Sequence, residues 1–156
     1  MAGRPRAQLK QTRPFRLLEE EAFVHIARTA DALLQGVAET VKPAGLSPTQ
    51  YHVLRILRGA GRDGLACRAI GKRMVNRDPD VTRLLDRLEN RGLVVRTRDR
   101  GDRRVITTRI TEAGLRVVMQ LDGPMVEVHT RLLGHLGAVR LRSLIDLLEL
   151  ARSKAG

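Results

Sequence analysis

Arginine is concentrated in one short segment of the chain, where five of the nine residues from Arg96 to Arg104 are arginine. A guanidinium group is always charged and presents a planar fork of N–H donors that matches phosphate oxygens and the edge of guanine. Asp99 and Asp102 lie within the segment, and we expect their carboxylates to fix neighbouring guanidinium groups by charge-assisted hydrogen bonds. The segment therefore predicts contact with a polyanion through Arg96, Arg98, Arg100, Arg103 and Arg104.

A second group of candidate contacts lies on a helix predicted from Asp78 to Arg91. Asp78 is the expected N-cap and Pro79 the first helical residue, and Gly92 follows the end of the helix. At 100° per residue, the apolar side chains share one side of this helix and the polar ones share the other. The apolar side consists of Val81, Leu84, Leu85 and Leu88, and the polar side of Pro79, Arg83, Asp86, Arg87 and Asn90.

This helix follows a shorter one, predicted over residues 66–74, after a turn of about four residues. Two short helices in this arrangement indicate a helix-turn-helix, in which the second helix enters the major groove of DNA. We therefore expect Arg83 and Arg87 to contact bases or phosphates, although they could instead pair with acids of their own helix. Asp86 is expected to orient Arg83 or Arg87 rather than to contact a base.

The net charge points to the same kind of partner. The 156-residue chain carries 29 Lys and Arg against 17 Asp and Glu, which is a formal net charge of +12. Residues 1–16 hold five basic side chains and no acid, residues 68–109 hold thirteen basic and six acidic ones, and the remainder is balanced. Such an excess indicates a polyanionic partner. Because only Phe15, Phe23 and Tyr51 are aromatic, the chain lacks the stacking platforms used for single strands, and duplex DNA is expected.

Other function classes are disfavoured. No run of consecutive apolar residues exceeds three, so we expect no membrane span and no secretory signal, and predict a cytoplasmic protein. Without a Gly-rich phosphate loop, a nucleophile elbow or paired carboxylates, we expect no enzymatic activity and no cofactor. The single cysteine, Cys67, is expected to be a small, partly buried residue rather than a redox sensor. No metal site is predicted from the scattered histidines, His25, His52, His129 and His135.

The elements that must position these residues are mostly helices. Apolar residues recur with a helical period from Phe15 to Val41, and Pro43 stops this helix. At about 1.5 Å per residue it would be about 40 Å long, longer than a small domain is wide, so it needs a partner surface. The remaining elements are a helix from Ser47 to Arg58, strands 93–97 and 104–110 joined by a polar turn, a helix from Thr111 to about 136 that pauses at Gly123 and Pro124, and a helix over 139–153. The predicted fold class is mainly α with one β-hairpin.

The segment GLVVRTRDRGDRRVITTRITEAG, residues 92–114, closely resembles the wing signature of the MarR family of winged-helix regulators. The positions that match are Asp102, Arg104, Ile110, Thr111 and Gly114. The preceding PDVTRLLDRLENRGLV, residues 79–94, is similar to the recognition helix of that family, and LSPTQYHVLRIL, residues 46–57, to its second helix. The resemblance covers the chain from about Phe15 onward, with the motifs in the family's order and spacing.

The resemblance implies a winged helix-turn-helix with N- and C-terminal dimerisation helices. It places a DNA-binding lobe at about 46–110 and dimerisation helices at about 15–42 and 111–153, within a single domain of residues 15–156. Residues 1–14 lie outside the pattern as a basic tail that is either flexible or in contact with flanking DNA.

The resemblance also implies which side chains meet DNA. Thr82, Arg83 and Arg87 would face the major groove, and Arg104 would enter the minor groove with Asp102 holding it. The expected function is that of a homodimeric, sequence-specific regulator on a pseudo-palindromic operator, in particular a repressor released by a small molecule. The alternative is an architectural protein that coats duplex DNA without choosing sequence, for which a shaped recognition helix is not needed.

Overall fold

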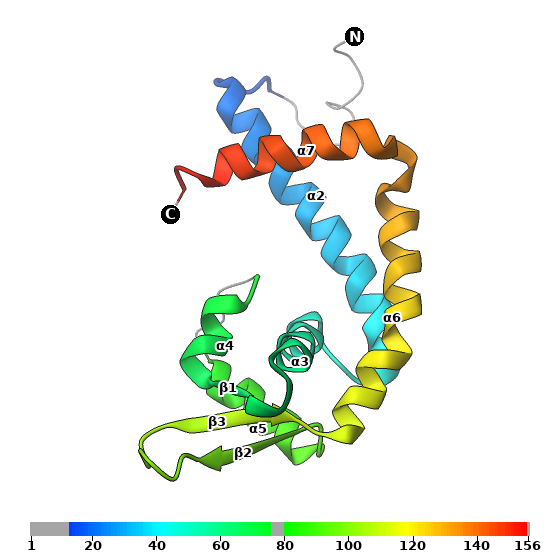
Figure 1. Cartoon of the computed structure of the whole chain (residues 1–156). Helices are drawn as coiled ribbons and strands as arrows, with labels where there is room; N and C mark the ends of the chain where they lie inside the picture. The colour runs from blue at the N-terminus through cyan, green and yellow to red at the C-terminus, as the bar shows by residue number, and fades with distance from the viewer. Residues whose placement is uncertain (1–12, 76–79, 156) are drawn as a thin grey trace. The chain divides into compact units, whose positions relative to one another are not determined.

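The computed structural model describes residues 13–75 and 80–155 of the chain (Figure 1). The chain divides into two compact units, Met1–Leu34 and Gln35–Gly156. The second unit holds a helical core and a small antiparallel sheet, which confirms the predicted mainly helical, winged helix-turn-helix class. Within the described ranges, no helix has the length and apolar character that crossing a membrane requires.

The first long helix, α2, covers Leu18–Val41, close to its predicted range. Three glutamates in its first turn lie near the positive end of the helix dipole, where negative charge is stabilising. It gives way to the short 3₁₀ helix η1, Lys42–Ala44, at Pro43 as predicted. Gly36 and Val41 are its only buried residues, so the apolar side chains of α2 are largely uncovered.

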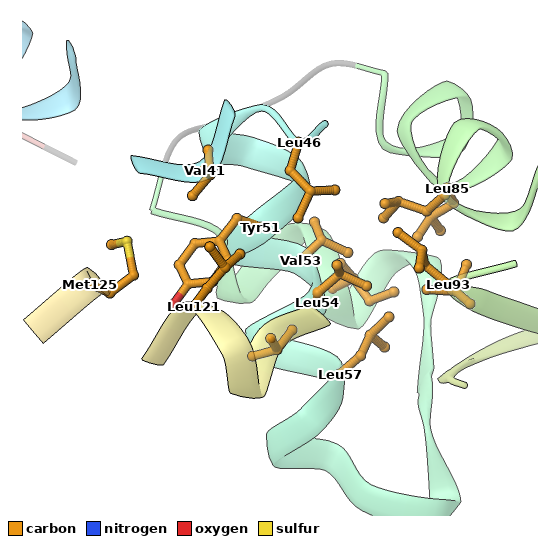
Figure 2. Packing of buried hydrophobic residues seen from close by; sticks show 14 of the residues in the cluster. Val41, Leu46, Tyr51, Val53, Leu54, Leu57, Leu85, Leu93, Leu121 and Met125 are labelled. Carbon is orange, nitrogen blue, oxygen red and sulfur yellow. The ribbon is translucent and has the colours of Figure 1, made fainter. Parts of the chain in front are cut away.

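The core of the second unit forms where α3 (Pro48–Ala60) packs against α6 (Glu112–Leu133). The helix predicted from Ser47 is confirmed, with Ser47 as its N-cap: the Ser47 hydroxyl accepts the Gln50 N–H at 3.1 Å, and the Gln50 side chain accepts the Ser47 N–H at 2.9 Å. Apolar side chains of both helices meet in one buried cluster (Figure 2). The cluster contains Tyr51, Val53, Leu54 and Leu57 from α3, and Val118, Leu121, Met125 and Val128 from α6.

Two shorter helices, α4 (Cys67–Arg73) and α5 (Val81–Asn90), pack on the same core. The start of α5 differs from the prediction. Asp80 is the N-cap, because its carboxylate accepts the Arg83 N–H at 3.0 Å, whereas Asp78 and Pro79 lie outside the described residues. Two aspartates precede the helix, and either has the short acceptor that a cap needs, so the choice between them was not visible in the sequence.

The sheet has a third strand that the sequence did not predict. β1 (Leu65–Ala66), β2 (Val94–Arg98) and β3 (Ile106–Ile110) lie in the order β1-β3-β2, with both pairings antiparallel. The expectation that one hairpin is the only β-structure is therefore wrong. β1 is held by pairing with Thr107 and Thr108, far along the chain, and two residues are too few to display the alternation that marks a strand.

The predicted pause of α6 at Gly123 and Pro124 is also wrong, since the helix continues through both residues. Proline inside a helix removes one backbone hydrogen bond and costs about 3 kcal/mol. Gln120, whose carbonyl would accept that hydrogen bond, is exposed, so water can satisfy it, while Met125, next to the proline, is buried in the core. Packing thus overrides the local signal. The 3₁₀ helix η3 (Gly134–Leu136) leads to α7 (Gly137–Arg152), which has no buried residue.

Thr108 on β3 supplies a stability test. Its side chain is fully buried, and its Oγ1 has no hydrogen-bond partner among the described residues. Thr108→Val keeps the shape and removes the hydroxyl, so we expect the free energy of unfolding to rise by about 1 kcal/mol in denaturant titration. Thr107→Val, in a half-buried position on the opposite face of the sheet, is the control and should change stability by less than about 0.5 kcal/mol. A loss of stability in Thr108→Val would contradict the absence of a partner.

Candidate nucleic-acid interface

Helix α5 presents an apolar face to the core and a polar face to solvent. Leu85 and Leu88 are buried, and Val81 and Leu84 pack half-buried against the core, which confirms the predicted apolar side. The exposed side carries Thr82, Arg83, Asp86, Arg87 and Asn90. The helix is therefore anchored along one side and displays a short polar surface along the other.

Two arginines on that surface are available to a ligand. Arg83 lies with its Nε 3.8 Å from Oδ2 of Asp80, and most of its side chain is exposed. Arg87 lies one turn further along the helix, and together with Asp80 and Leu84 the two arginines line a shallow hollow of about 220 Å³. An exposed ion pair of this length contributes little, so Arg83 can exchange it for a phosphate or a base edge.

Asp86 has a different partner from the one expected. Its carboxylate forms an ion pair with the guanidinium of Arg96 on β2, and not with Arg83 or Arg87, so the predicted role in orienting those residues is wrong. Glu89 accepts from the same guanidinium at 2.9 Å and from the Arg96 backbone N–H at 2.9 Å. The hydrogen bond from the Arg96 side chain holds the pKa of Glu89 below its usual range. Arg96, a predicted DNA contact, is thus engaged inside the protein.

The loop between β2 and β3, residues 99–105, is shaped by its two aspartates. Oδ1 of Asp99 accepts the Gly101 N–H at 2.8 Å, and Oδ1 of Asp102 accepts the Arg104 N–H at 3.0 Å. Both carboxylates therefore fix the backbone of the turn. The expectation that they hold guanidinium groups is wrong, because no ion pair joins either acid to an arginine within the described residues.

The cationic groups of the hairpin are left exposed by this arrangement. β3 begins at Ile106 rather than at Arg104 as predicted, so Arg104 belongs to the loop. Four arginines of the hairpin have a guanidinium without a hydrogen bond or ion pair to the described residues of the protein. They are Arg98, Arg100, Arg103 and Arg104. The backbone of the turn is held by the aspartates, and the N–H donors of these guanidinium groups point to no acceptor among the described residues. They can therefore bind phosphates or enter a minor groove.

Helix α4 contributes basic residues that were not predicted as contacts. Arg68, Lys72 and Arg73 are exposed, and the helix contains no acid. In a helix-turn-helix the first helix crosses the phosphate backbone, where such side chains are in reach of phosphates. They lie in the segment 68–109, whose excess of basic residues was a usable signal, although contacts were predicted only on the second helix and the hairpin.

Two further arginines of the segment 68–109 donate hydrogen bonds to backbone carbonyls within the lobe. Arg91, after α5, donates from Nη1 to the Gly45 carbonyl at 2.7 Å and from Nη2 to the Ala44 carbonyl at 2.8 Å. Arg109 on β3 donates from Nε to the carbonyl of Arg62 in η2 (Gly61–Asp63) at 2.6 Å. The charge excess therefore overstates the number of cations that face outward.

Cys67 and His52 have structural partners. Cys67 is half-buried against the core, with its Sγ 3.9 Å from Oγ1 of Thr82. Nε2 of His52 accepts the Val75 N–H at 3.2 Å. Among the residues that the structure describes, no three His, Cys, Asp or Glu side chains are grouped so that they could hold a metal ion.

Comparison with known sequences gives matches across the lobe. The profile of the MarR family matches residues 46–106. The transcriptional regulator MhqR of Bacillus subtilis is 29% identical over 60% of this chain and 63% of its own length. The transcriptional repressor MdtR of the same organism is 37% identical over 49% of this chain and 48% of its own. The matched region thus spans between about half and two thirds of these curated relatives.

Solved structures match over more of the chain. A MarR transcription factor from Planctomyces limnophilus is 42% identical, with 88% of this chain and 99% of that chain covered and a TM-score of 0.68. CouR from Rhodococcus jostii RHA1, bound to p-coumaroyl-CoA, is 27% identical over 86% and 94% of the chains at a TM-score of 0.72. A MepR–DNA complex from S. aureus is 22% identical and shares the fold, with 88% of this chain and 98% of that chain covered and a TM-score of 0.75. On the near-complete match to the first of these structures, the chain belongs to the MarR family of transcriptional regulators.

Proposed function

We propose that this protein is a homodimeric regulator that binds double-stranded DNA at specific sequences. The observation that carries the proposal is that two surfaces lie on one lobe. One is helix α5, which is anchored on the core and exposes Thr82, Arg83 and Arg87. The other is the loop of residues 99–105, whose arginines form no hydrogen bond or ion pair with the described residues of the protein. The helix fits a major groove, and the loop of residues 99–105 fits the minor groove beside it. The MepR structure, described as a DNA complex, supports this use of the fold.

The shape of the reading surface favours sequence choice over uniform coating. A protein that only coats DNA needs cations for phosphates, and those are supplied here by α4 and the hairpin. Helix α5 adds a hydroxyl at Thr82 and an amide at Asn90 to its arginines, on a backbone fixed by the Asp80 cap. Groups of these types can discriminate base edges. An architectural protein is the alternative.

The exposed apolar side chains of the long helices support a homodimer. On α2 the ring of Phe23 is 72% exposed, and on α7 Leu147 is 64% exposed. Large apolar side chains left uncovered on two long helices are more typical of an interaction surface than of a monomeric protein. Two lobes related by a two-fold axis would bind a pseudo-palindrome with half-sites about 10 base pairs apart.

Control by a small molecule is the second part of the proposal. CouR, which shares the fold, is described as bound to p-coumaroyl-CoA, and MdtR is described as a repressor. We infer repression that is relieved by an organic ligand, without enzymatic turnover. We expect such a regulator to act in the cytoplasm.

Sequence choice can be measured by competition. A duplex enriched by the protein from a randomised 30-base-pair library should bind at least about a thousandfold more tightly than a random duplex at the same salt concentration. The enriched sequences should contain two inverted half-sites. Equal affinity for both duplexes would establish the architectural alternative.

Arg104 tests the loop. Arg104→Ala should weaken binding of the enriched duplex by about 1 to 3 kcal/mol, because an exposed minor-groove cation is lost while the turn keeps its backbone bonds. Arg152→Ala, at the end of α7, removes the same charge elsewhere and should leave affinity unchanged. Unchanged binding in Arg104→Ala would remove the loop from the interface.

The dimer can be tested without DNA. Light scattering at micromolar concentration should give the mass of two chains for the native protein. The double variant Phe23→Glu/Leu147→Glu places a charge on each exposed helix and should give one chain. Val95→Glu, an exposed apolar position on β2, serves as the control and should remain dimeric. A monomeric native protein would refute the proposed assembly.

A further inference from the structure

Arg96 differs from the other arginines of the hairpin in its surroundings. It lies on β2, and only 22% of its side chain is exposed. Its Nη2 contacts both Asp86 and Glu89, and its backbone N–H donates to the second oxygen of Glu89. Side chain and backbone of one strand residue are therefore bound to two carboxylates of α5.

The charges of this cluster argue against a direct contact with phosphate. Two carboxylates surround one guanidinium, so the local charge is negative rather than positive. A phosphate approaching Arg96 would meet Asp86, about half of which is exposed, on the same polar side of α5 as Arg83 and Arg87. Arg98 lies two residues along the same strand and on the same side of the sheet, and no ion pair or hydrogen bond joins its guanidinium to an acid among the described residues.

We propose that Arg96 is a positioning residue. It fixes the angle and distance between the recognition helix α5 and the wing, which consists of β2, β3 and the loop between them, so that the helix and the loop reach their grooves together. This inference rests on the proposed DNA-binding function. Because α5 and the wing would read neighbouring grooves, a change in their relative position would cost affinity even if every contacting side chain remained. Arg91 secures the C-terminal end of α5 in a similar way, through the carbonyls of Ala44 and Gly45.

Salt dependence separates positioning from phosphate contact. We expect Arg96→Gln to weaken binding of the library-enriched duplex about tenfold, while the slope of log affinity against log salt stays unchanged. The matched control Arg98→Gln, on the same strand, should make that negative slope shallower by about 0.9, as loss of one phosphate contact does. Thermal unfolding and circular dichroism of each variant check that the fold is retained.

Glu89→Gln gives an independent reading of the same cluster. Removing a negative charge beside DNA would by itself strengthen binding, but loss of the link to Arg96 should weaken it. The double variant Glu89→Gln/Arg96→Gln should bind no more weakly than Arg96→Gln alone, since both changes break one connection. If Arg96→Gln is poorly folded, Arg96→Lys keeps the charge, loses the fork and should again weaken binding with an unchanged slope.

A slope shallower by about 0.9 in Arg96→Gln, tighter binding in Glu89→Gln, or additive losses in the double variant would each overturn the proposal. Failure of the library to enrich any duplex would instead refute sequence-specific binding. In that case the same salt series on a random-sequence duplex still decides the role of Arg96. A shallower slope would make it a phosphate contact, and an unchanged slope would leave it a group that holds the helix against the strand.

Discussion

The apolar side chains of α3 hold together the elements that carry candidate DNA contacts. Leu54 and Leu57 lie in a buried cluster to which α5 adds Leu85 and Leu88, α4 adds Ile70, and β2 adds Val94. Burying such side chains is the main favourable term in forming the lobe. Without that cluster, the polar face of α5 and the hairpin would have no fixed relation to one another. The same packing keeps α6 helical across Pro124, although the proline removes one backbone hydrogen bond.

Polar interactions divide the arginines of residues 91–109 into two groups. Arg91, Arg96 and Arg109 are bound by carbonyls or carboxylates within the lobe, where they connect segments distant in sequence. Arg98, Arg100, Arg103 and Arg104 lie on or beside a turn that the aspartates organise through backbone N–H groups. A guanidinium serves either use because its planar donors match both carboxylates and phosphates. What decides between the uses is whether an acceptor of the protein lies within reach.

The long helices have the opposite character. Helices α2, α6 and α7 together carry ten acidic and six basic side chains, and they leave large apolar side chains uncovered on α2 and α7. A lobe with a strong positive field and helices with apolar surfaces suit different partners, a polyanion for the one and a second copy of the chain for the other. Membership of the MarR family is consistent with both uses.

Features that depend on neighbouring residues could be predicted from the sequence. The period of apolar residues defined the faces of α5, Ser47 indicated the start of α3, and the motifs around Asp102 indicated the family. The misplaced features all depend on residues that meet only in the folded chain. β1 exists because it pairs with Thr107 and Thr108, Asp86 turns to Arg96, and α6 continues because its apolar side is buried. Local propensity and spacing are encoded within a few residues, whereas the partner of a charge or of a strand is settled only when packing brings distant segments together.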